Sequence, residues 1–356
     1  MTPSRHELLL ADFSSGRTAA LARAISIVEN HRAGFEELLA TWHPRLGHAR
    51  RIGVTGPPGA GKSTLTTGLT RAYRAEGLTV GIIAVDPTSP FTGGALLGDR
   101  IRMEDVALDP GVYIRSLATR GSLGGLSAAA REACDVLDAF GIDRILIETV
   151  GVGQSELDVA RTADTSLVVL VPESGDSIQT LKAGLMEIAD IFAVNKADRP
   201  GADRLRNEIE VMLGMRAGAT MRNVPAHHGV DLSANNIVKQ VRAAAATDDL
   251  EQWTPPVLRT VAVKEDGITE LVAALDRHFR YLEASGTLRT RRRRRLRERV
   301  VEVVEAKARR RLWNDAATNE WLEDRLPALE AGTATPFGIA DDLLGRSADL
   351  LTRTQS

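Results

Sequence analysis

Between residues 50 and 200, short apolar runs rich in β-branched residues alternate with amphipathic stretches. Apolar positions in those stretches recur three and four residues apart, which is the spacing of helices that cover one face of a sheet. This alternation is typical of an α/β fold with a doubly wound, mostly parallel sheet. The runs predict strands at 51–55, 79–85, 112–116, 144–148, 166–171 and 191–195.

Helical spacing dominates on both sides of this region. Residues 18–42 place apolar side chains at helical intervals and predict helices before the sheet. Residues 214–236 lose any period. The remaining pattern predicts helices at 204–213, 267–281 and 289–311 and a short strand at 257–263.

The sequence Gly-Pro-Pro-Gly-Ala-Gly-Lys-Ser follows the first predicted strand and opens a helix predicted over 63–76. Glycines in such a loop let backbone N–H groups surround phosphates, and the helix N-terminus adds partial positive charge. Lys62 can reach the β- and γ-phosphates, and Ser63 supplies a hydroxyl ligand for Mg²⁺. The predicted nucleotide-binding residues of this loop are Gly56, Pro57, Pro58, Gly59, Ala60, Gly61, Lys62, Ser63 and Thr64.

A second motif, Asn195-Lys196-Ala197-Asp198, follows the strand predicted at 191–195 and lies at its carboxyl end, where open α/β sheets bind ligands. The Asp198 carboxylate can accept hydrogen bonds from the N1–H and the amino group of guanine, a donor pair that adenine lacks. The two motifs together predict GTP or GDP with Mg²⁺ as the ligand.

Acidic residues lie at the carboxyl ends of two of the intervening strands: Asp86 follows the strand predicted at 79–85, and Glu148 ends the strand predicted at 144–148. Glu148 can hold Mg²⁺ through water, and the Gly151 N–H can sense the terminal phosphate. Asp86 and Asp99 are candidate carboxylates on the metal side, although aspartates such as Asp99 are also common at helix starts on the surface.

Val152 occupies the position where many GTPases carry the glutamine that orients the attacking water. Gln154 could take that role after a rearrangement. A GTPase that is slow alone and activated by a partner or by loop closure is the simpler interpretation. Asp176 and Lys182 could pair with each other or with a switch residue, or be surface charges.

Composition adds few constraints. Lys and Arg number 45 against 47 Asp and Glu, so the net charge of −2 predicts neither nucleic-acid nor membrane binding. The single cysteine, Cys134, excludes a disulfide framework and fits a core helix. Neither a signal peptide nor the roughly 18 continuous apolar residues of a spanning helix occurs, which predicts a cytoplasmic protein.

Two local clusters have an alternative interpretation. The adjacent His227 and His228 have no third ligand nearby, so a solvated loop is favoured over a metal site. Arg291–Arg295 could neutralise phosphates, but no aromatic residues alternate with them. We therefore expect a solvated helix face, with an apolar stripe near Trp313 and Trp321 that packs against a partner subunit.

Five segments carry a resemblance to the MeaB/ArgK family of GTPases. They are Gly-Pro-Pro-Gly-Ala-Gly-Lys-Ser-Thr at 56–64, Val-Asp-Pro-Thr-Ser-Pro-Phe-Thr-Gly-Gly-Ala-Leu-Leu-Gly-Asp-Arg at 85–100, Ala-Thr-Arg-Gly-Ser-Leu-Gly-Gly-Leu at 118–126, Glu-Thr-Val-Gly-Val-Gly-Gln-Ser-Glu at 148–156 and Asn-Lys-Ala-Asp at 195–198. The likeness is close over roughly residues 17–213 and looser in the C-terminal arm, and 214–236 has no match.

The resemblance implies a GTPase chaperone of an adenosylcobalamin-dependent acyl-CoA mutase, chiefly methylmalonyl-CoA mutase, with the cobalamin held by that partner. It also implies a homodimer formed through the C-terminal arm, and three switch segments at 87–102, 149–156 and 172–187. Asp86, Asp99 and Glu148 would then lie near the metal, and Asp176 and Lys182 would signal to the mutase.

The family usually has Ser-Ala near the base after the Pro-Pro pair, whereas this chain has Val261-Ala262. Base contacts from Val261, Ala262 and Val263 would therefore use the backbone. We expect an N-terminal helical extension at 1–48, a P-loop GTPase domain at 49–283 and a C-terminal helical dimerisation arm at 284–356.

Three other functions compete with this interpretation. A nickel- or cobalt-insertion GTPase would need clusters of Cys and His, and this chain has one Cys and seven scattered His. A small-molecule kinase needs an acceptor pocket with a base, where this sequence offers a guanine motif. A scaffold with a structural nucleotide would show no turnover.

Overall fold

The computed structural model describes residues 4–87, 103–119, 128–149, 155–172, 184–216, 234–246 and 252–346. The chain forms two compact units, Met1–Arg289 and Thr290–Ser356. The domain boundaries expected after residues 48 and 283 stay predictions.

Seven strands in the first unit form one sheet in which every neighbouring pair is parallel, in the order β3-β2-β4-β1-β5-β6-β7. This arrangement confirms the predicted α/β class and puts β1 at the centre of the sheet. The strands are β1 Arg50–Thr55, β2 Val80–Pro87, β3 Val112–Thr119, β4 Arg144–Thr149, β5 Thr165–Leu170, β6 Ile191–Val194 and β7 Val257–Arg259.

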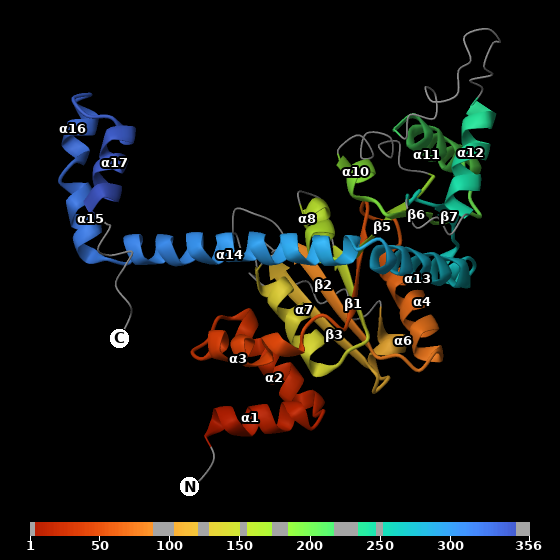
Figure 1. The fold of residues 1–356 in the computed structure, drawn as a ribbon, viewed down its shortest axis with the longest axis horizontal. Helices are drawn as coiled ribbons and strands as arrows, with labels where there is room; N and C mark the ends of the chain where they lie inside the picture. The colour runs from red at the N-terminus through yellow and green to blue at the C-terminus, as the bar shows by residue number, and fades with distance from the viewer. Residues whose placement is uncertain are drawn as a thin grey trace. The chain divides into compact units, whose positions relative to one another are not determined.

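Helices cover both faces of this sheet (Figure 1), and neighbouring strand residues such as Ile82 and Ile83 enter different cores. One face packs on α4 (Lys62–Ala75), α6 (Glu104–Ala107) and α13 (Ile268–Ala284). The other packs on α7 (Ala128–Phe140), α8 (Ser155–Thr162) and α11 (Ala202–Arg216). Cys134 is buried in α7, as predicted. The shorter or additional helices of this unit are η1 His43–Arg45, α10 Met186–Ile188, α12 Ala234–Ala246 and η3 Ala262–Lys264.

The N-terminal residues form three helices, α1 (Arg5–Ser14), α2 (Thr18–Glu29) and α3 (Phe35–Trp42), of which α2 and α3 pack on α7 (Figure 1). The helices predicted within 18–42 are confirmed as α2 and α3, with a break between Glu29 and Phe35. Gly34 precedes α3 with φ 86°, a left-handed conformation that breaks a helix.

The structure differs from the predictions at three further places. The strand expected at 257–263 ends at Arg259, because the chain then turns through η3 and pairs Val261 with Asp266 in an isolated bridge. Helix α12 was not predicted, since its start lies in the stretch without a period. Helix α11 also extends to Arg216, beyond its predicted end.

The buried carboxylate of Asp138 in α7 fixes the link between the N-terminal helices and β1. It accepts the backbone N–H groups of Gly47, His48 and Ala49 at 2.9–3.1 Å, and it pairs with Arg51 at 3.1 Å. Four donors thus converge on one carboxylate that is 1% exposed.

We expect Asp138→Ala to lower the free energy of unfolding by about 3 kcal/mol, because it leaves the buried N–H of Ala49, two partly buried N–H groups and a mostly buried arginine without this acceptor. Urea denaturation of the variant and the parent measures the change. Glu208→Ala, which removes an exposed pair with Arg204, serves as the control and should cost about 0.5 kcal/mol or less. A similar small loss for Asp138→Ala would contradict the role assigned to its carboxylate.

The described part of the second unit is helical. Its helices are α14 (Thr287–Trp313), α15 (Ala316–Glu323), α16 (Leu326–Glu330) and α17 (Pro336–Arg346), and α14 begins three residues before the unit boundary at Thr290. Helix α14 (Figure 1) confirms the helix predicted at 289–311, and none of its residues is buried. Trp321, which was expected near the apolar stripe of this helix, packs inside its own unit with Ile339 and Leu343. None of the helices in the described ranges is long and apolar enough to cross a bilayer.

Candidate nucleotide site

The phosphate-binding loop joins β1, which ends at Thr55 in the middle of the sheet, to α4, which begins at Lys62. Two of its glycines are required by close approach. A Cβ on Gly56 (φ 139°) would lie 2.0 Å from the carbonyl oxygen of Val169, and one on Gly61 (φ 85°) would lie 2.4 Å from Nδ2 of Asn195. The loop is therefore fitted between β5 and the second motif.

Lys62 lies along this loop and is 6% exposed. Its Nζ donates to the carbonyl oxygens of Gly56 at 2.6 Å and Pro57 at 3.1 Å. Pro58, Gly59 and Thr64 are exposed, and Ala60 is buried. The ammonium group is thus held inside the loop, next to the backbone that would surround a phosphate chain.

Ser63 and Glu148, which the sequence predicts on the metal side, are in contact. The Ser63 hydroxyl donates to Oε1 of Glu148 at 2.5 Å, and both residues are buried. Asp86 is two residues beyond Ala84, the register partner of Glu148, so it lies at the same edge of the sheet. A hydroxyl and a carboxylate this close offer the hard oxygen donors that Mg²⁺ prefers.

Asn195 connects the phosphate-binding loop to the loop after β7. Its Nδ2 donates to the carbonyl oxygen of Ala60 at 2.8 Å. Its Oδ1 accepts from the hydroxyl of Thr260 at 3.2 Å and from the N–H of Ala262 at 3.1 Å. One buried side chain thus ties together both loops expected to hold the nucleotide. A base contact through the Ala262 N–H requires that N–H to be shared with Asn195.

Asp198 is the exposed end of the second motif. Its side chain is 43% exposed, and Oδ2 lies 3.3 Å from Nζ of Lys264. Lys196, two residues before Asp198, has φ 55°, and the Val263 side chain of η3 is exposed. The carboxylate is therefore accessible to a ligand and has one cationic neighbour at the surface.

Arg71 of α4 holds the end of the segment 261–265, which follows β7 and contains the residues predicted to contact the base. It donates to Glu265, directly after η3, and to Asp105 of α6, each at 2.6 Å. The hydrogen bond that Arg71 donates to Glu265 and the negative charges of Glu265 and Asp105 raise the pKa of the Arg71 guanidinium, which strengthens its hold on both carboxylates.

Several predicted residues lie outside the described residues, as do most of the three expected switch segments. These are Asp99, Gly151, Gln154, Asp176, Lys182, His227 and His228. Within the ranges that the structure describes, no group of three or more His, Cys, Asp or Glu side chains could hold a metal ion.

Sequence reasoning missed three residues beside the site. Thr260 bonds Asn195, Lys264 pairs with Asp198, and Arg259 donates to the carbonyl oxygen of Ala197 at 3.1 Å. Thr260 and Lys264 directly flank segment 261–263, which was predicted to contact the base, so their positions in the sequence could have indicated that they lie beside the site. The contact of Arg259 depends on the pairing of β6 with β7 and had no local signal.

Comparisons with known proteins agree with this geometry. The profile of the family described as Methylmalonyl Co-A mutase-associated GTPase MeaB matches residues 21–317. The chain is 35% identical to GTPase ArgK of Escherichia coli over 325 residues, which cover 90% of each protein. It is 30% identical to the mitochondrial methylmalonic aciduria type A homolog of Mus musculus over 356 residues, covering 95% of this chain and 76% of that protein.

A crystal structure of LAO/AO transport system kinase superimposes with a TM-score of 0.66 at 27% identity, covering 97% of this chain and 99% of that one. The profile match spans most of the chain, including the phosphate-binding loop and the Asn-Lys-Ala-Asp motif. This chain therefore belongs to the MeaB family of P-loop GTPases.

Proposed function

We propose that this chain binds GTP and GDP with Mg²⁺ between the phosphate-binding loop and the Asn-Lys-Ala-Asp loop, and that it hydrolyses GTP. The observation that carries the proposal is the bonding of Asn195, which joins Ala60 of the first loop to Thr260 and Ala262 beside the second. A single ligand can therefore meet the phosphate loop at one end and Asp198 at the other.

Within this site Lys62 binds the β- and γ-phosphates, and Ser63 is a direct ligand of Mg²⁺. Glu148 and the carboxylates of Asp86 and Asp99 act on the metal side, Glu148 through water. These oxygens would hold Mg²⁺, and the ion would supply positive charge against the charge that develops on the phosphates. Gly151 senses the terminal phosphate, and Gln154 is the candidate for orienting water. The contact between Ser63 and Glu148 supports the pairing of these two oxygens around one cation.

Asp198 selects guanine through its two carboxylate oxygens, and Asn195 and Lys196 hold the loop that presents it. Val261, Ala262 and Val263 contribute through their backbone. No side chain of these three carries a hydroxyl, so Asp198 supplies the main side-chain recognition of the base.

We further propose that GTP hydrolysis gates the loading and protection of adenosylcobalamin in an acyl-CoA mutase such as methylmalonyl-CoA mutase. The family description names that mutase, and the mouse relative is named for methylmalonic aciduria. The cobalamin is held by the partner enzyme. Asp176 and Lys182 transmit the nucleotide state to it.

The C-terminal arm is proposed to form a homodimer in the cytoplasm, with neither nucleic acid nor membrane as a partner. Helix α14 exposes a run of valines that soluble helices normally cover, and Val300 and Val304 are 63% and 60% exposed. A second copy of the arm would cover them. Sedimentation of the full chain tests this, and a monomer at micromolar concentration would contradict it.

Hydrolysis is expected to be slow in the isolated protein and to rise about 10–100-fold when the cognate mutase is added, as expected for loop closure by a partner. The reason is Val152, which cannot orient water. Phosphate release at saturating GTP, with and without mutase, measures the effect. Lys182→Ala is the matched variant and should keep the slow basal rate while losing stimulation.

Fast turnover without a partner would contradict this proposal. The small-molecule kinase remains a second candidate because the superimposed crystal structure carries that name. The same assay separates the two, since a GTPase releases one phosphate for each GTP consumed, whereas a kinase retains the phosphoryl group on an acceptor.

A further inference from the structure

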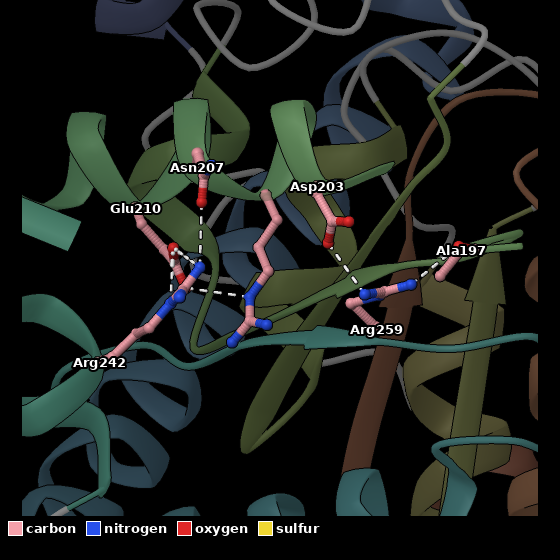
Figure 2. A network of polar contacts seen from close by, with 7 residues as sticks. Ala197, Asp203, Asn207, Glu210, Arg242 and Arg259 are labelled. Carbon is pink, nitrogen blue, oxygen red and sulfur yellow. Dashed lines mark hydrogen bonds and ion pairs between the residues drawn. The ribbon is translucent and has the colours of Figure 1, made fainter. Parts of the chain in front are cut away.

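Arg259, the last residue of β7, lies between the Asn-Lys-Ala-Asp loop and the start of α11 (Figure 2). Its Nη2 donates to the carbonyl oxygen of Ala197 at 3.1 Å. Its Nη1 donates to Oδ1 of Asp203 at 2.9 Å. One planar guanidinium therefore joins the residue before Asp198 to a carboxylate on a helix.

Ala197 is held on both sides. Its N–H donates to the carbonyl oxygen of Thr260 at 3.0 Å, and its own carbonyl oxygen accepts from Arg259. Both contacts come from consecutive residues at the end of β7. The carbonyl of Ala197 belongs to the peptide unit that leads into Asp198, so the bond from Arg259 fixes the plane from which the Asp198 side chain departs.

The loop needs this support. Lys196 has φ 55°, a conformation that residues with a side chain adopt only when their surroundings hold it. The Asp198 side chain is 43% exposed. Its described side-chain partner is Lys264, which is also exposed, and such surface pairs hold a side chain weakly. Packing alone therefore does not orient the carboxylate.

Asp203 links Arg259 to α11. Asp203, Asn207 and Glu210 follow each other at four and three residues and so share one face of this helix. The latter two receive Arg242 of α12, which donates to Asn207 at 3.0 Å and pairs with Glu210 at 2.8 Å (Figure 2). Glu210 is buried and also pairs with Arg206. The helix that carries Asp203 is thus itself held in place.

We propose that Arg259 is a positioning residue for guanine selection: it orients Asp198 by holding the carbonyl of Ala197 against Asp203. The inference rests on the proposed GTP site, since it assigns the selectivity of that site to a residue outside it. Asp198 must present two oxygens to two neighbouring donors, and a displacement of about 1 Å removes both hydrogen bonds from good geometry.

A purely structural role predicts a different result. Arg259 is 45% exposed and Asp203 is 73% exposed, so their pair contributes little to global stability. Loss of Arg259 should therefore leave the unfolding midpoint almost unchanged while changing which base is bound. The two roles are therefore separated by comparing the affinity for the base with the affinity for the phosphates alone. A positioning residue changes the first and leaves the second unchanged.

The test is a titration of Arg259→Met with Mg²⁺ and GTP, ITP or inorganic tripolyphosphate. ITP lacks the 2-amino group and so forms only one of the two bonds to Asp198. We expect GTP affinity to fall about tenfold, because both charge-assisted hydrogen bonds to Asp198 are weakened by poorer geometry, and ITP affinity to fall less. The affinity for tripolyphosphate should not change, because this ligand has no base and contacts only the phosphate-binding loop.

Two variants serve as controls. Arg204→Gln removes an arginine of α11 that pairs with Glu208 at 2.9 Å, and it should leave all three affinities unchanged. Arg259→Lys keeps the charge but reaches only one of the two acceptors, so GTP affinity should fall to an intermediate value. It also tests the proposal if Arg259→Met folds poorly.

A double-mutant cycle with Asp203→Ala completes the experiment. Asp203→Ala alone should weaken GTP about threefold, and it should have no further effect once Arg259 is methionine, because it acts through that arginine. Additive losses, or an unchanged ratio of GTP to ITP affinity in Arg259→Met, would overturn the inference while leaving the GTP site intact. A parent protein that binds GTP no better than ATP would overturn the proposed function itself, and this inference with it.

Discussion

Replacing Lys62 with alanine is expected to lower the affinity for GTP by about 100-fold or more, since charge-assisted hydrogen bonds to phosphate contribute about 1.5–3 kcal/mol each and this lysine can make two. In the structure its Nζ is held by Gly56 and Pro57 inside the loop, and the side chain is almost completely buried. The ammonium therefore needs little reorganisation to reach the β- and γ-phosphates.

Calorimetric titration with a non-hydrolysable GTP analogue measures this loss. Lys239→Ala, which removes an exposed lysine on α12, is the control for net charge and should bind normally. The fold of the Lys62 variant should persist, because the loop is also fixed by its glycines and by Asn195. Retained affinity in Lys62→Ala would remove this lysine from the nucleotide site.

The central part of the fold could be predicted because its signals are local. Strand β1, the glycine-rich loop and α4 follow each other within a single stretch, and the helix predicted at 63–76 is observed at Lys62–Ala75. The parallel sheet followed from the alternation of apolar runs with amphipathic stretches. The family was recognisable from the same segments, and the profile match confirms it.

The errors arose where distant contacts decide the conformation. The helices within 18–42 were predicted but the break between them was not, because the apolar period continues across Gly34 where α2 and α3 both pack on α7. Residues 257–263 have strand propensity throughout, yet the hydrogen bonds of Thr260 and Ala262 to Asn195 pull the chain out of the sheet after Arg259. Helix α1 had a local signal that was overlooked, the capping box of Ser4 and Glu7.

The candidate site divides in the same way. Ser63 and Glu148 were predicted on one side of the metal, and the structure brings them into contact. The pairing of Lys264 with Asp198 joins residues 66 positions apart, and no spacing rule indicates it. The functional roles of all these residues stay predictions, whereas their contacts are features of the fold.

Asp198→Asn is expected to exchange the preferred base. Guanine presents two donors, and asparagine offers one acceptor and one donor where aspartate offers two acceptors. GTP should bind less tightly by about 2–4 kcal/mol, because a charge-assisted bond is lost and a donor then faces a donor. Xanthine carries a carbonyl in place of the amino group, so the new amide can donate to it and XTP should gain affinity.

The contacts of Asp198 indicate that this substitution changes the preferred base without disturbing the fold or the loop. Its pair with Lys264 is exposed, so losing that pair should change the free energy of unfolding by about 1 kcal/mol or less. The bonds of Asn195 to Ala60, Thr260 and Ala262 do not involve Asp198 and should hold the loop in the variant. Val261 has no hydroxyl that could keep a preference for guanine.

Competition of GTP, XTP and ATP against one fluorescent nucleotide measures the exchange. Asp342→Asn, an exposed carboxylate of α17, makes the same chemical change in the other unit and should leave the ranking as it is in the parent. The phosphate contacts are common to the three nucleotides, so their relative affinities report on the base alone. Equal losses for GTP and XTP would mean that Asp198 supports the loop without reading guanine.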